Sequence, residues 1–453
     1  MPFSDFRLHA DLLKGVKELG FTRPTPIQEQ AIPPAAEGRD ILASAMTGSG
    51  KTAAFVVPIV HRIMAKPRGV TRALILTPTR ELAAQIHAHM EDLAVHTPVS
   101  SASIFGGVGM APQEHALRSG VDVIVATPGR LLDHIRRPYA RLAALEILVL
   151  DEADRMLDMG FLPDIKRILR HIPRRRQTLL FSATLPKEIL GLARELLNEP
   201  VTINIDRKAA PAVGITHAVY PVAQHLKSEF LLELLKQNVI ADAIVFTRTK
   251  HRADRLSASL HRQSIATALI HGGRSQGQRR AALAGFKSGR QRVLVATDIV
   301  ARGIDVESLG HVVNFDVPAD PDAYVHRVGR TARAEATGTA FTLVSPQEEG
   351  DLRSIEAALG RRLPRVLLPG FDYQKAPERP GGTPAGQRRA GPRPGGDGTP
   401  PPEWRGKSGK GKRRRSSSSS AHARGRSREE RFQRILDKHA PLTHATAGRK
   451  PRR

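Results

Sequence analysis

The sequence predicts an α/β protein with two tandem domains, each a parallel sheet flanked by helices. Over residues 1–370, short apolar runs of strand length alternate with helix-like stretches, which is typical of repeated strand–helix–strand units. The runs form two series, and a polar segment at residues 206–215 separates them. A length of 453 residues also favours two domains. We therefore expect a first domain over 1–205, a linker over 206–215 and a second domain over 216–370.

Composition narrows the class of protein. A formal net charge of +26 indicates a polyanionic partner. The chain contains no cysteine, which excludes disulfides and cysteine-ligated zinc. No apolar run approaches the roughly 20 residues of a membrane span, and residues 1–11 lack the apolar stretch of a signal peptide. We expect a soluble, cytoplasmic protein with no membrane partner.

The first motif lies between two expected helices. Leucine and valine at helical spacing predict a helix over residues 12–19. The stretch from Phe21 to Gln28 follows, and its prolines make it rigid. An aromatic ring and a side-chain amide are what adenine recognition needs, for stacking and for a paired contact to N6 and N7. Taken alone, the same stretch is also typical of a surface turn.

A glycine-rich loop joins the first expected strand, at residues 40–43, to a helix. Gly48 and Gly50 allow backbone N–H groups to surround a phosphate at the start of that helix. Lys51 would reach the β and γ phosphates, and Thr52 would ligate Mg²⁺. Ala45 occupies the position of the first glycine in the strict phosphate-loop pattern. The run GSGKT between a strand and a helix still predicts a nucleotide phosphate site.

Later strands of the first domain each end in a polar turn. We expect strands at residues 73–76, 121–125, 147–150 and 178–181, followed by turns at 78–81, 127–130, 151–154 and 182–184. In a parallel sheet these turns share one edge, which is where ligands bind. Threonine and arginine there suit phosphate contacts, although each turn alone is also typical of a helix cap.

The turn after residues 147–150 carries two adjacent carboxyl groups, Asp151 and Glu152. A carboxylate at the end of a buried strand can hold hydrated Mg²⁺, and its neighbour can orient or deprotonate a water. Acidic residues also commonly cap the next helix. The neighbouring motifs therefore have to decide between the two interpretations.

The second domain repeats the strand pattern without a phosphate loop. Strands are expected at residues 243–246, 266–270, 292–296, 311–315 and 340–344. Its loops are basic, above all residues 326–333, which include Arg330 and Arg333. Such a cluster suggests a domain that completes another domain's site with arginine side chains. A solvated basic surface is the alternative.

Beyond residue 370 the composition changes. Residues 371–403 hold 7 Gly and 8 Pro, too many for a packed core. Residues 371–453 carry 22 Lys and Arg against 7 Asp and Glu, a formal charge of +15. We expect a disordered basic tail over 371–453, with one short helix near residues 428–440.

In this order, the motifs resemble those of the DEAD-box ATP-dependent RNA helicases of superfamily 2. The compact core and the basic tail resemble the bacterial RhlE branch of that family. The resemblance covers residues 1 to about 370. It implies two RecA-like domains that close on ATP, Mg²⁺ and single-stranded or structured RNA. It also makes ribosomal precursor particles or the RNA-decay machinery candidate partners.

Position by position, the resemblance implies an ATP site in the first domain that the second domain completes. Asp151 matches the Mg²⁺ ligand, with Thr52, and Glu152 matches the general base. Arg330 and Arg333 match the arginine fingers, and Lys51 the lysine that holds the phosphates. The remaining nucleotide contacts would come from Phe3, Phe21, Gln28, Thr47, Gly48, Ser49, Gly50 and Asp305.

The resemblance also implies a set of residues that contact RNA or couple hydrolysis to RNA. They are Pro78, Thr79, Arg80, Gly106, Gly107, Thr127, Gly129, Arg130, Ser182, Thr184, Arg248, Gln276, Arg279 and Thr297. Three positions depart from the family pattern: Met46 replaces a usual Gln, Ala332 a usual Gly and Val300 a common Ala. None removes a charge that the chemistry needs.

These residues predict an RNA-stimulated ATPase that opens or remodels RNA locally. Contacts to phosphates and sugars would give low sequence selectivity. Two other classes of function remain open. An RNA clamp or annealing factor would depend on the basic tail and survive loss of Glu152. A translocating DNA helicase would unwind long DNA processively.

Overall fold

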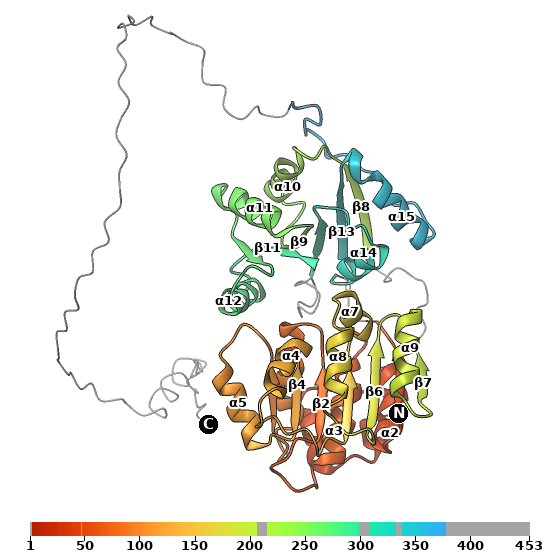
Figure 1. Cartoon of the computed structure of the whole chain (residues 1–453). Helices are drawn as coiled ribbons and strands as arrows, with labels where there is room; N and C mark the ends of the chain where they lie inside the picture. Colours follow the sequence, from red (N-terminus) through yellow and green to blue (C-terminus); the bar gives the residue numbers. More distant parts are fainter. Residues whose placement is uncertain (1, 47, 206–214, 299–308, 332–337, 377–453) are drawn as a thin grey trace, which may run out of the picture. The chain divides into compact units, whose positions relative to one another are not determined.

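In the computed structural model, the described residues are 2–46, 48–205, 215–298, 309–331 and 338–376. They contain two parallel sheets, one for each expected domain (Figure 1). The prediction of two α/β units with parallel sheets is therefore confirmed. No helix in these ranges is both long and apolar enough to cross a bilayer.

The first domain is a seven-stranded sheet with the order β3-β4-β2-β5-β6-β1-β7. All of its strand pairs are parallel. The strands are β1 (Ile41–Ser44), β2 (Ala73–Leu76), β3 (Ser101–Ile104), β4 (Val123–Ala126), β5 (Ile147–Leu150), β6 (Gln177–Ser182) and β7 (Val201–Asn204).

Helices cover both faces of this sheet because alternate strand residues point to opposite sides. Ile147 and Val149 pack with one group of helices, whereas Leu148 and Leu150 pack with the other. The first group is α1 (Ala10–Glu18), α2 (Pro26–Ala36), α3 (Lys51–Ile63) and α4 (Arg80–Leu93), after a short 3-10 turn at Phe3–Phe6. The second is α5 (Met110–Ser119), α6 (Pro128–Ile135), α7 (Ala153–Asp158), α8 (Leu162–Leu169) and α9 (Lys187–Leu196).

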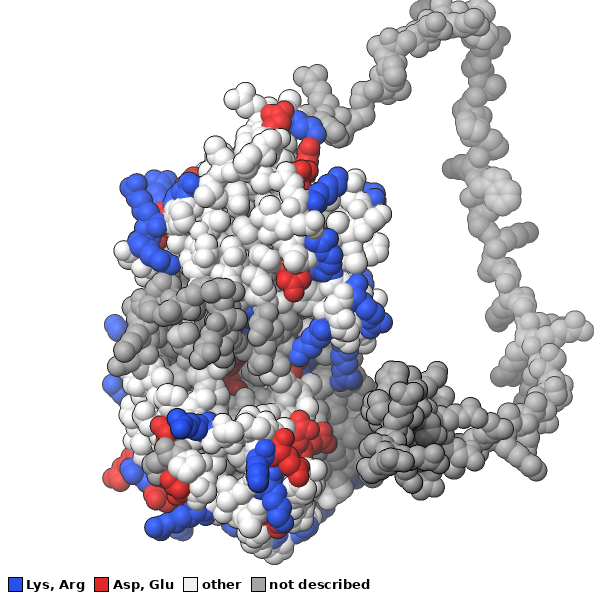
Figure 2. Space-filling model, turned by 180° about the vertical axis from the view of Figure 1, so that it is seen from behind, with Lys and Arg blue, Asp and Glu red and all other residues white. Residues whose placement is uncertain are grey.

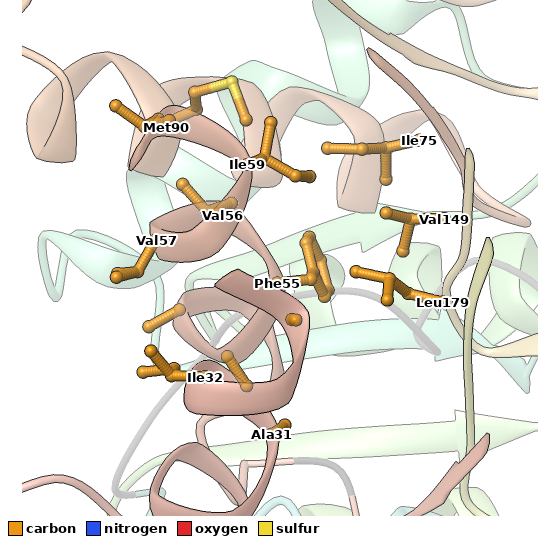
Figure 3. Packing of buried hydrophobic residues seen from close by; sticks show 14 of the residues in the cluster. Ala31, Ile32, Phe55, Val56, Val57, Ile59, Ile75, Met90, Val149 and Leu179 are labelled. Carbon is orange, nitrogen blue, oxygen red and sulfur yellow. The ribbon is translucent and has the colours of Figure 1, made fainter. Parts of the chain in front are cut away.

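Helix α3 lies at the centre of the first core. Phe55 on this helix is fully buried and points toward Val149 and Leu179 of the sheet (Figure 3). Its ring is 5.4 Å from that of Phe181. Since α3 begins at the glycine-rich loop, this packing fixes the position of the loop relative to the ends of β5 and β6.

The second domain is a six-stranded sheet with the order β10-β11-β9-β12-β13-β8. Its strands are β8 (Ile215–Pro221), β9 (Ala243–Thr247), β10 (Thr267–Ile270), β11 (Val293–Thr297), β12 (His311–Asn314) and β13 (Gly338–Val344). Helices α10 (Lys227–Lys236) and α11 (Lys250–Arg262) pack on one face. On the other lie α12 (Gln276–Lys287), α14 (Pro321–Val328) and α15 (Glu349–Leu359), the last after a 3-10 turn at Pro346–Glu348.

Three strands were not predicted, and all three lie at the edges of their sheets; two of them have low apolar content. In β3 only Ile104 is fully buried, and in β7 only Ile203 is. Edge strands face solvent and therefore need no continuous apolar run. The third, β8, starts at Ile215, within the segment predicted as linker. The rest of that linker, residues 206–214, lies outside the described residues.

The second domain continues past the predicted boundary at residue 370. Residues 363–376, which we call the C-terminal strap, run along the edge strand β8. The backbone N–H of Val219 donates to Pro364, and that of Val366 donates to Val219, at 2.9 and 2.8 Å. Phe371 then packs edge-on against Phe230 of α10, with ring centroids 4.8 Å apart. The expectation that the tail begins at 371 is corrected, because residues 371–376 pack on the domain; residues 377–453 lie outside the described part.

We predict that truncation after Gly370 destabilises the protein, whereas truncation after Ala376 does not. The shorter chain loses Phe371 and Tyr373, whose rings pack on Phe230. Loss of two partly buried aromatic rings should lower the free energy of unfolding of the second domain by about 1–3 kcal/mol. Urea denaturation of both truncated proteins measures this difference, and equal midpoints would contradict a structural role for the strap.

Candidate functional site

The phosphate loop enters helix α3 through glycines in the left-handed backbone region. Gly48 and Gly50 have φ of 82° and 92°, which residues with a Cβ rarely adopt. A Cβ on Gly50 would also lie 2.5 Å from the side-chain amide of Gln28. The loop therefore presents backbone N–H groups at the positive end of α3, where an anion is stabilised. Thr47 lies outside the described residues.

The lysine of this loop is buried and bonded to its own loop. Lys51 is 7% exposed, and its Nζ donates to the carbonyl oxygen of Ala45 at 2.7 Å. Ser49 and Thr52 follow the same turn, and Thr52 lines the adjoining cavity. An anion at the helix terminus would compete with the Ala45 carbonyl for the ammonium group.

Gln28 connects the aromatic segment to the phosphate loop. Its amide nitrogen donates to the carbonyl oxygen of Gly50 at 3.0 Å, and its amide oxygen accepts from the N–H of Thr25 at 2.9 Å. Both ends of the amide thus contact the backbone of the protein. Gln28 still lines the cavity, so one N–H and one lone pair remain for a base.

The two predicted aromatic residues occupy different places. Phe21 lines the cavity, and its ring stacks on that of Phe3 at 6.1 Å, with the rings tilted by 22°. Phe3 is only 4% exposed and does not line the cavity. The structure therefore places Phe3 behind Phe21, as support for the exposed ring, instead of at the surface that a nucleotide would contact.

The two adjacent carboxyl groups are buried at the end of β5. Asp151 is 3% exposed and Glu152 is 6% exposed. Glu152 has φ of 51°, a backbone conformation that is strained for a residue with a Cβ. Its N–H donates to Asp151 at 3.0 Å, and its carboxylate pairs with the guanidinium of Arg155 one helical turn later. Such local strain persists only where the surrounding contacts hold it.

The two carboxyl groups have opposite pKa shifts. Burial raises the pKa of Asp151 to about 7, against the opposing effect of Lys51 and with help from the neighbouring Glu152. Burial also acts to raise the pKa of Glu152, but Arg155, Lys51 and Arg330 outweigh it, and the pKa is lowered. Glu152 is thus ionised at neutral pH and can accept a proton.

The oxygen ligands at this point fit Mg²⁺. Asp151 supplies a buried carboxylate, and Thr52 supplies a hydroxyl at the start of α3. Within the described ranges no cluster of three or more His, Cys, Asp or Glu could hold a metal ion. One carboxylate with phosphate oxygens and waters is the usual way in which proteins bind Mg²⁺.

Asp154 links the acidic turn, which is the turn at residues 151–154 after β5, to the turn after β6. Its carboxylate accepts hydrogen bonds from the N–H groups of Ala183 and Thr184, at 3.1 and 2.8 Å, and from the Thr184 hydroxyl at 2.9 Å. The hydroxyl of Ser182 accepts from the N–H of Asp154 at 3.2 Å. These hydrogen bonds therefore connect the predicted coupling residues Ser182 and Thr184 to the turn that contains Asp151 and Glu152.

The predicted RNA-facing residues of the first domain lie at the carboxyl ends of neighbouring strands. Thr79 caps α4, after Pro78 and β2. The guanidinium of Arg80 lies against the glycine pair after β3, and a Cβ on Gly107 would come 2.1 Å from it. Arg130 donates to the carbonyl oxygen of Val108 at 3.1 Å. Two arginines thus hold the loop that contains Gly106 and Gly107.

The turn after β4 carries the other two predicted residues of this group. Thr127 precedes α6 and is 8% exposed. A Cβ added to Gly129 would meet nothing within 4 Å. Space therefore remains beside the backbone of Gly129, where another chain can approach closely.

In the second domain, Gln276 and Arg279 contact Glu81 of the first domain. The Gln276 amide donates to Glu81 at 3.0 Å, and the Arg279 guanidinium donates to it at 2.6 Å. Both partners of the ion pair are nearly buried, each with 8% of its side chain exposed. These two residues, expected to contact RNA or to couple hydrolysis to RNA, connect the two domains in this structure.

Other predicted residues of the second domain occupy the end of its sheet. Arg248 follows β9 and donates to the carbonyl oxygen of Val317 and the carboxylate of Asp351, at 2.9 and 3.0 Å. Thr297 ends β11 and is paired in register with Thr247. Arg330 is 5% exposed. Asp305 and Arg333 lie outside the described residues.

A cavity of about 690 Å³ brings the predicted nucleotide residues together. Its walls include Phe21, Gln28, Gly48, Gly50, Lys51, Thr52, Asp151, Glu152 and, from the second domain, Gln276, Arg279 and Arg330. We call it the nucleotide cavity. The cavity thus combines an aromatic ring for a base, a phosphate loop for the phosphates and a carboxyl group for the metal ion, which are the groups that a nucleoside triphosphate requires.

Sequence reasoning named Glu81 and Arg327 only as members of the segments 78–81 and 326–333, and it missed Arg155 and the ion pairs that all three residues form. Arg155 pairs with Glu152, and Glu81 bonds across the domains. Arg327 makes two hydrogen bonds of 2.6 Å to Asp298 and so holds the residue that follows β11. The spacing of three residues between Glu152 and Arg155 on a helix was a usable signal. The other two pairs lie too far apart in the sequence to be matched without a structure.

Comparisons with known proteins agree with these observations. The family model described as DEAD/DEAH box helicase matches residues 25–191, and the helicase conserved C-terminal domain matches residues 226–335. The ATP-dependent RNA helicase CshA of Listeria monocytogenes is 43% identical over 370 residues, which is 82% of this chain and 71% of that protein. The Bacillus subtilis CshA is 42% identical, over 82% of this chain and 75% of its own length.

A solved structure has a similar fold over both domains. Dbp5 of S. cerevisiae, bound to RNA and ADP BeF3, aligns with a TM-score of 0.74 and 31% identity. The alignment covers 81% of this chain and 95% of Dbp5.

We predict that Asp151→Asn stabilises the nucleotide-free protein at high pH. The folded carboxyl group has a pKa of about 7, above its ordinary value of 3.8, so ionising it costs folding free energy as the pH rises between these values. The variant should gain about 1–3 kcal/mol at pH 8 and nearly nothing at pH 4.

Urea denaturation without Mg²⁺ at both pH values measures the gain. The matched control is Asp133→Asn, whose side chain is 58% exposed and which should change little. A gain at pH 8 no larger than that at pH 4 would contradict the raised pKa.

Proposed function

The chain belongs to the DEAD-box family of ATP-dependent RNA helicases, and from this membership we propose how its own residues couple ATP hydrolysis to local opening of RNA. The observation that carries the proposal is the buried Glu152, which pairs with Arg155 and lines the same cavity as Lys51 and Arg330. Lys51 and Arg155 come from the first domain, and Arg330 from the second. Glu152 therefore has all three cations around it only where the two domains meet.

Hydrolysis in this scheme is a matter of position and charge. Glu152 orients the attacking water and accepts its proton. Lys51 leaves the Ala45 carbonyl for the phosphates, and Arg330 stabilises the charge that develops on the γ phosphate, with Arg333 as a second arginine. Asp151 and Thr52 would hold Mg²⁺, whose charge neutralises the phosphate oxygens when it is bound.

Adenine recognition is assigned to the segment from Phe21 to Gln28, which matches the Q motif of the family. Phe21 offers a ring that Phe3 supports from behind. Gln28 offers one donor and one acceptor while remaining bonded to Gly50 of the phosphate loop. Occupation of the base site would thus act directly on the loop that holds the phosphates. Asp305 is proposed to contact the ribose.

Two connections carry the effect of ATP to the RNA side. Within the first domain, the bonds between Asp154 and Thr184 join the acidic turn to the turn after β6. Between the domains, Glu81 bonds Gln276 and Arg279. Glu81 follows Arg80 directly, so closure of the domains also positions an RNA-facing arginine. Contacts to phosphates and sugars predict low sequence selectivity.

The finer assignments rest on the sequence. We place the protein in the RhlE branch because of its compact core and basic tail, although the relatives reported above carry the name CshA. We also propose that the protein acts in the cytoplasm, on ribosomal precursor particles or in RNA decay. Crosslinking of RNA in cells to the hydrolysis-blocked Glu152→Gln variant, followed by sequencing, tests the assignment to ribosomal precursor particles or RNA decay.

The basic tail is proposed as a tether for RNA. On the face shown in Figure 2, Lys and Arg of the described residues are interspersed with Asp and Glu. Residues 371–453, in contrast, hold 22 Lys and Arg against 7 Asp and Glu. Such a segment binds phosphates without regard to sequence and raises the local concentration of RNA.

We predict that Glu152→Gln binds ATP and RNA but hydrolyses ATP about 10²–10⁴-fold more slowly, since the base is lost while the shape is kept. RNA-stimulated ATPase rates and fluorescent-nucleotide binding measure the two properties. Glu188→Gln, an exposed change in the same domain, is the control. Wild-type turnover in Glu152→Gln would refute the role of Glu152 and favour the RNA-clamp alternative.

We predict that truncation after Ala376, which keeps the strap, leaves ATPase at saturating RNA unchanged but weakens RNA binding at low salt. Each phosphate neutralised on a single strand contributes about −0.7 to the slope of log K against log salt. Loss of about five tail contacts would therefore flatten the slope by roughly 3.5. Identical affinities and slopes for both proteins would reject the tether.

A further inference from the structure

A second cavity adjoins the nucleotide cavity at the catalytic centre. It has a volume of about 620 Å³, and its walls share Lys51, Glu152 and Arg330 with the nucleotide cavity. The remaining walls differ. The second cavity extends to the end of α7, the turn between β6 and α9, and the start of α14, and it includes neither Phe21 nor Gln28. A nucleotide bound between the Q motif and the phosphate loop would leave this second space open.

The geometry of hydrolysis places the two products on different sides of these three residues. Water attacks the γ phosphorus in line with the bond to the β–γ bridging oxygen, which breaks as the new P–O bond forms. The electron pair of the broken bond leaves with ADP, and the proton of the water goes to Glu152. Since ADP occupies the nucleotide cavity, the orthophosphate formed on the side of the attacking water faces the second cavity.

The inner part of the second cavity is buried and carries positive charge. Lys51, Arg155 and Arg330 are 7%, 8% and 5% exposed, and these three cations exceed the two carboxylates beside them, Glu152 and Asp154. The volume is large enough for orthophosphate with several waters, because a water in the liquid occupies about 30 Å³. A hydrated anion can therefore occupy this space without displacing the protein around it.

The outer part carries three exposed carboxylates and one half-buried histidine, His326. Asp158 comes from α7 of the first domain, and Asp320 and Asp322 come from α14 of the second. Asp320 also caps α14, through hydrogen bonds from the N–H groups of Asp322 and Ala323. Carboxylates at the opening disfavour a resting anion there and oppose entry of ATP or RNA phosphates. The opening thus suits passage of phosphate in preference to its storage.

We propose that the second cavity is the exit path by which orthophosphate leaves the catalytic centre while ADP still fills the nucleotide cavity. The proposal rests on the proposed ATPase function and adds a route to it. Phosphate release then depends on α7 and α14 and on the width between them. It becomes a step separate from both bond cleavage and ADP release, as product release is in many enzymes.

The test narrows the opening in the full-length protein with RNA bound. Asp322→Trp does so from α14, and Asp158→Trp does so from α7, so that the second variant remains if the first fails to fold. Val325→Trp is the matched control, because Val325 is on α14, is 40% exposed and does not line the cavity. Asp322→Asn removes the charge but keeps the width.

Rapid quenching in a single turnover measures cleavage, and a fluorescent phosphate sensor measures free phosphate. We expect both narrowing variants to cleave ATP at the wild-type rate but to release phosphate about tenfold more slowly. Val325→Trp and Asp322→Asn should release it at least as fast as the wild type.

Unchanged release in the narrowing variants would overturn the exit path, and so would equal slowing in Asp322→Asn or parallel slowing of cleavage and release. These outcomes differ from failure of the proposed function, in which the wild type itself shows no RNA-stimulated cleavage.

Discussion

Two adjacent carboxyl groups at the end of β5 are buried, and buried negative charge is stable only where cations or hydrogen bonds compensate it. Asp151 and Glu152 share the influence of Lys51 from the phosphate loop. Glu152 has Arg155 as a further partner, and Arg330 of the second domain also lowers its pKa. The phosphate loop, α7 and the second domain therefore all depend on the charge at this one point.

Nearby positive charge compensates the two carboxyl groups unequally, and this difference separates their proposed roles as base and metal ligand. Glu152 has most of the nearby positive charge and remains ionised, as a base requires. Asp151 has less, and burial raises its pKa to about 7. A divalent cation favours the ionised form of such a carboxyl group. On the proposed assignment, the site keeps Glu152 ionised for a proton and Asp151 available for a metal, at a cost in stability that is common at functional sites.

The central part of the fold and most of the site could be predicted because their signals are local. Strand β5 and its acidic turn, and the glycines before α3, are contiguous in the sequence. The edge strands β3 and β7 were missed since half-exposed strands have no continuous apolar run. The pairing of Glu81 with Arg279 joins residues 198 positions apart, and the packing of Phe371 on Phe230 depends on a chain reversal. No local pattern encodes either contact.

The ion pair between Glu81 and Arg279 offers a physical basis for the proposed coupling between ATP hydrolysis and RNA contact. Its two side chains are each 8% exposed, and breaking a buried pair by removing one partner is costly because the other charge stays uncompensated. Arg80, next to Glu81, lies against the Gly106–Gly107 loop. On the proposed assignment, a change in domain separation that breaks the ion pair would act directly beside Arg80, at the same terminus of α4. Coupling in this protein then requires no long pathway, because one helix terminus contacts the partner domain and the loop assigned to RNA.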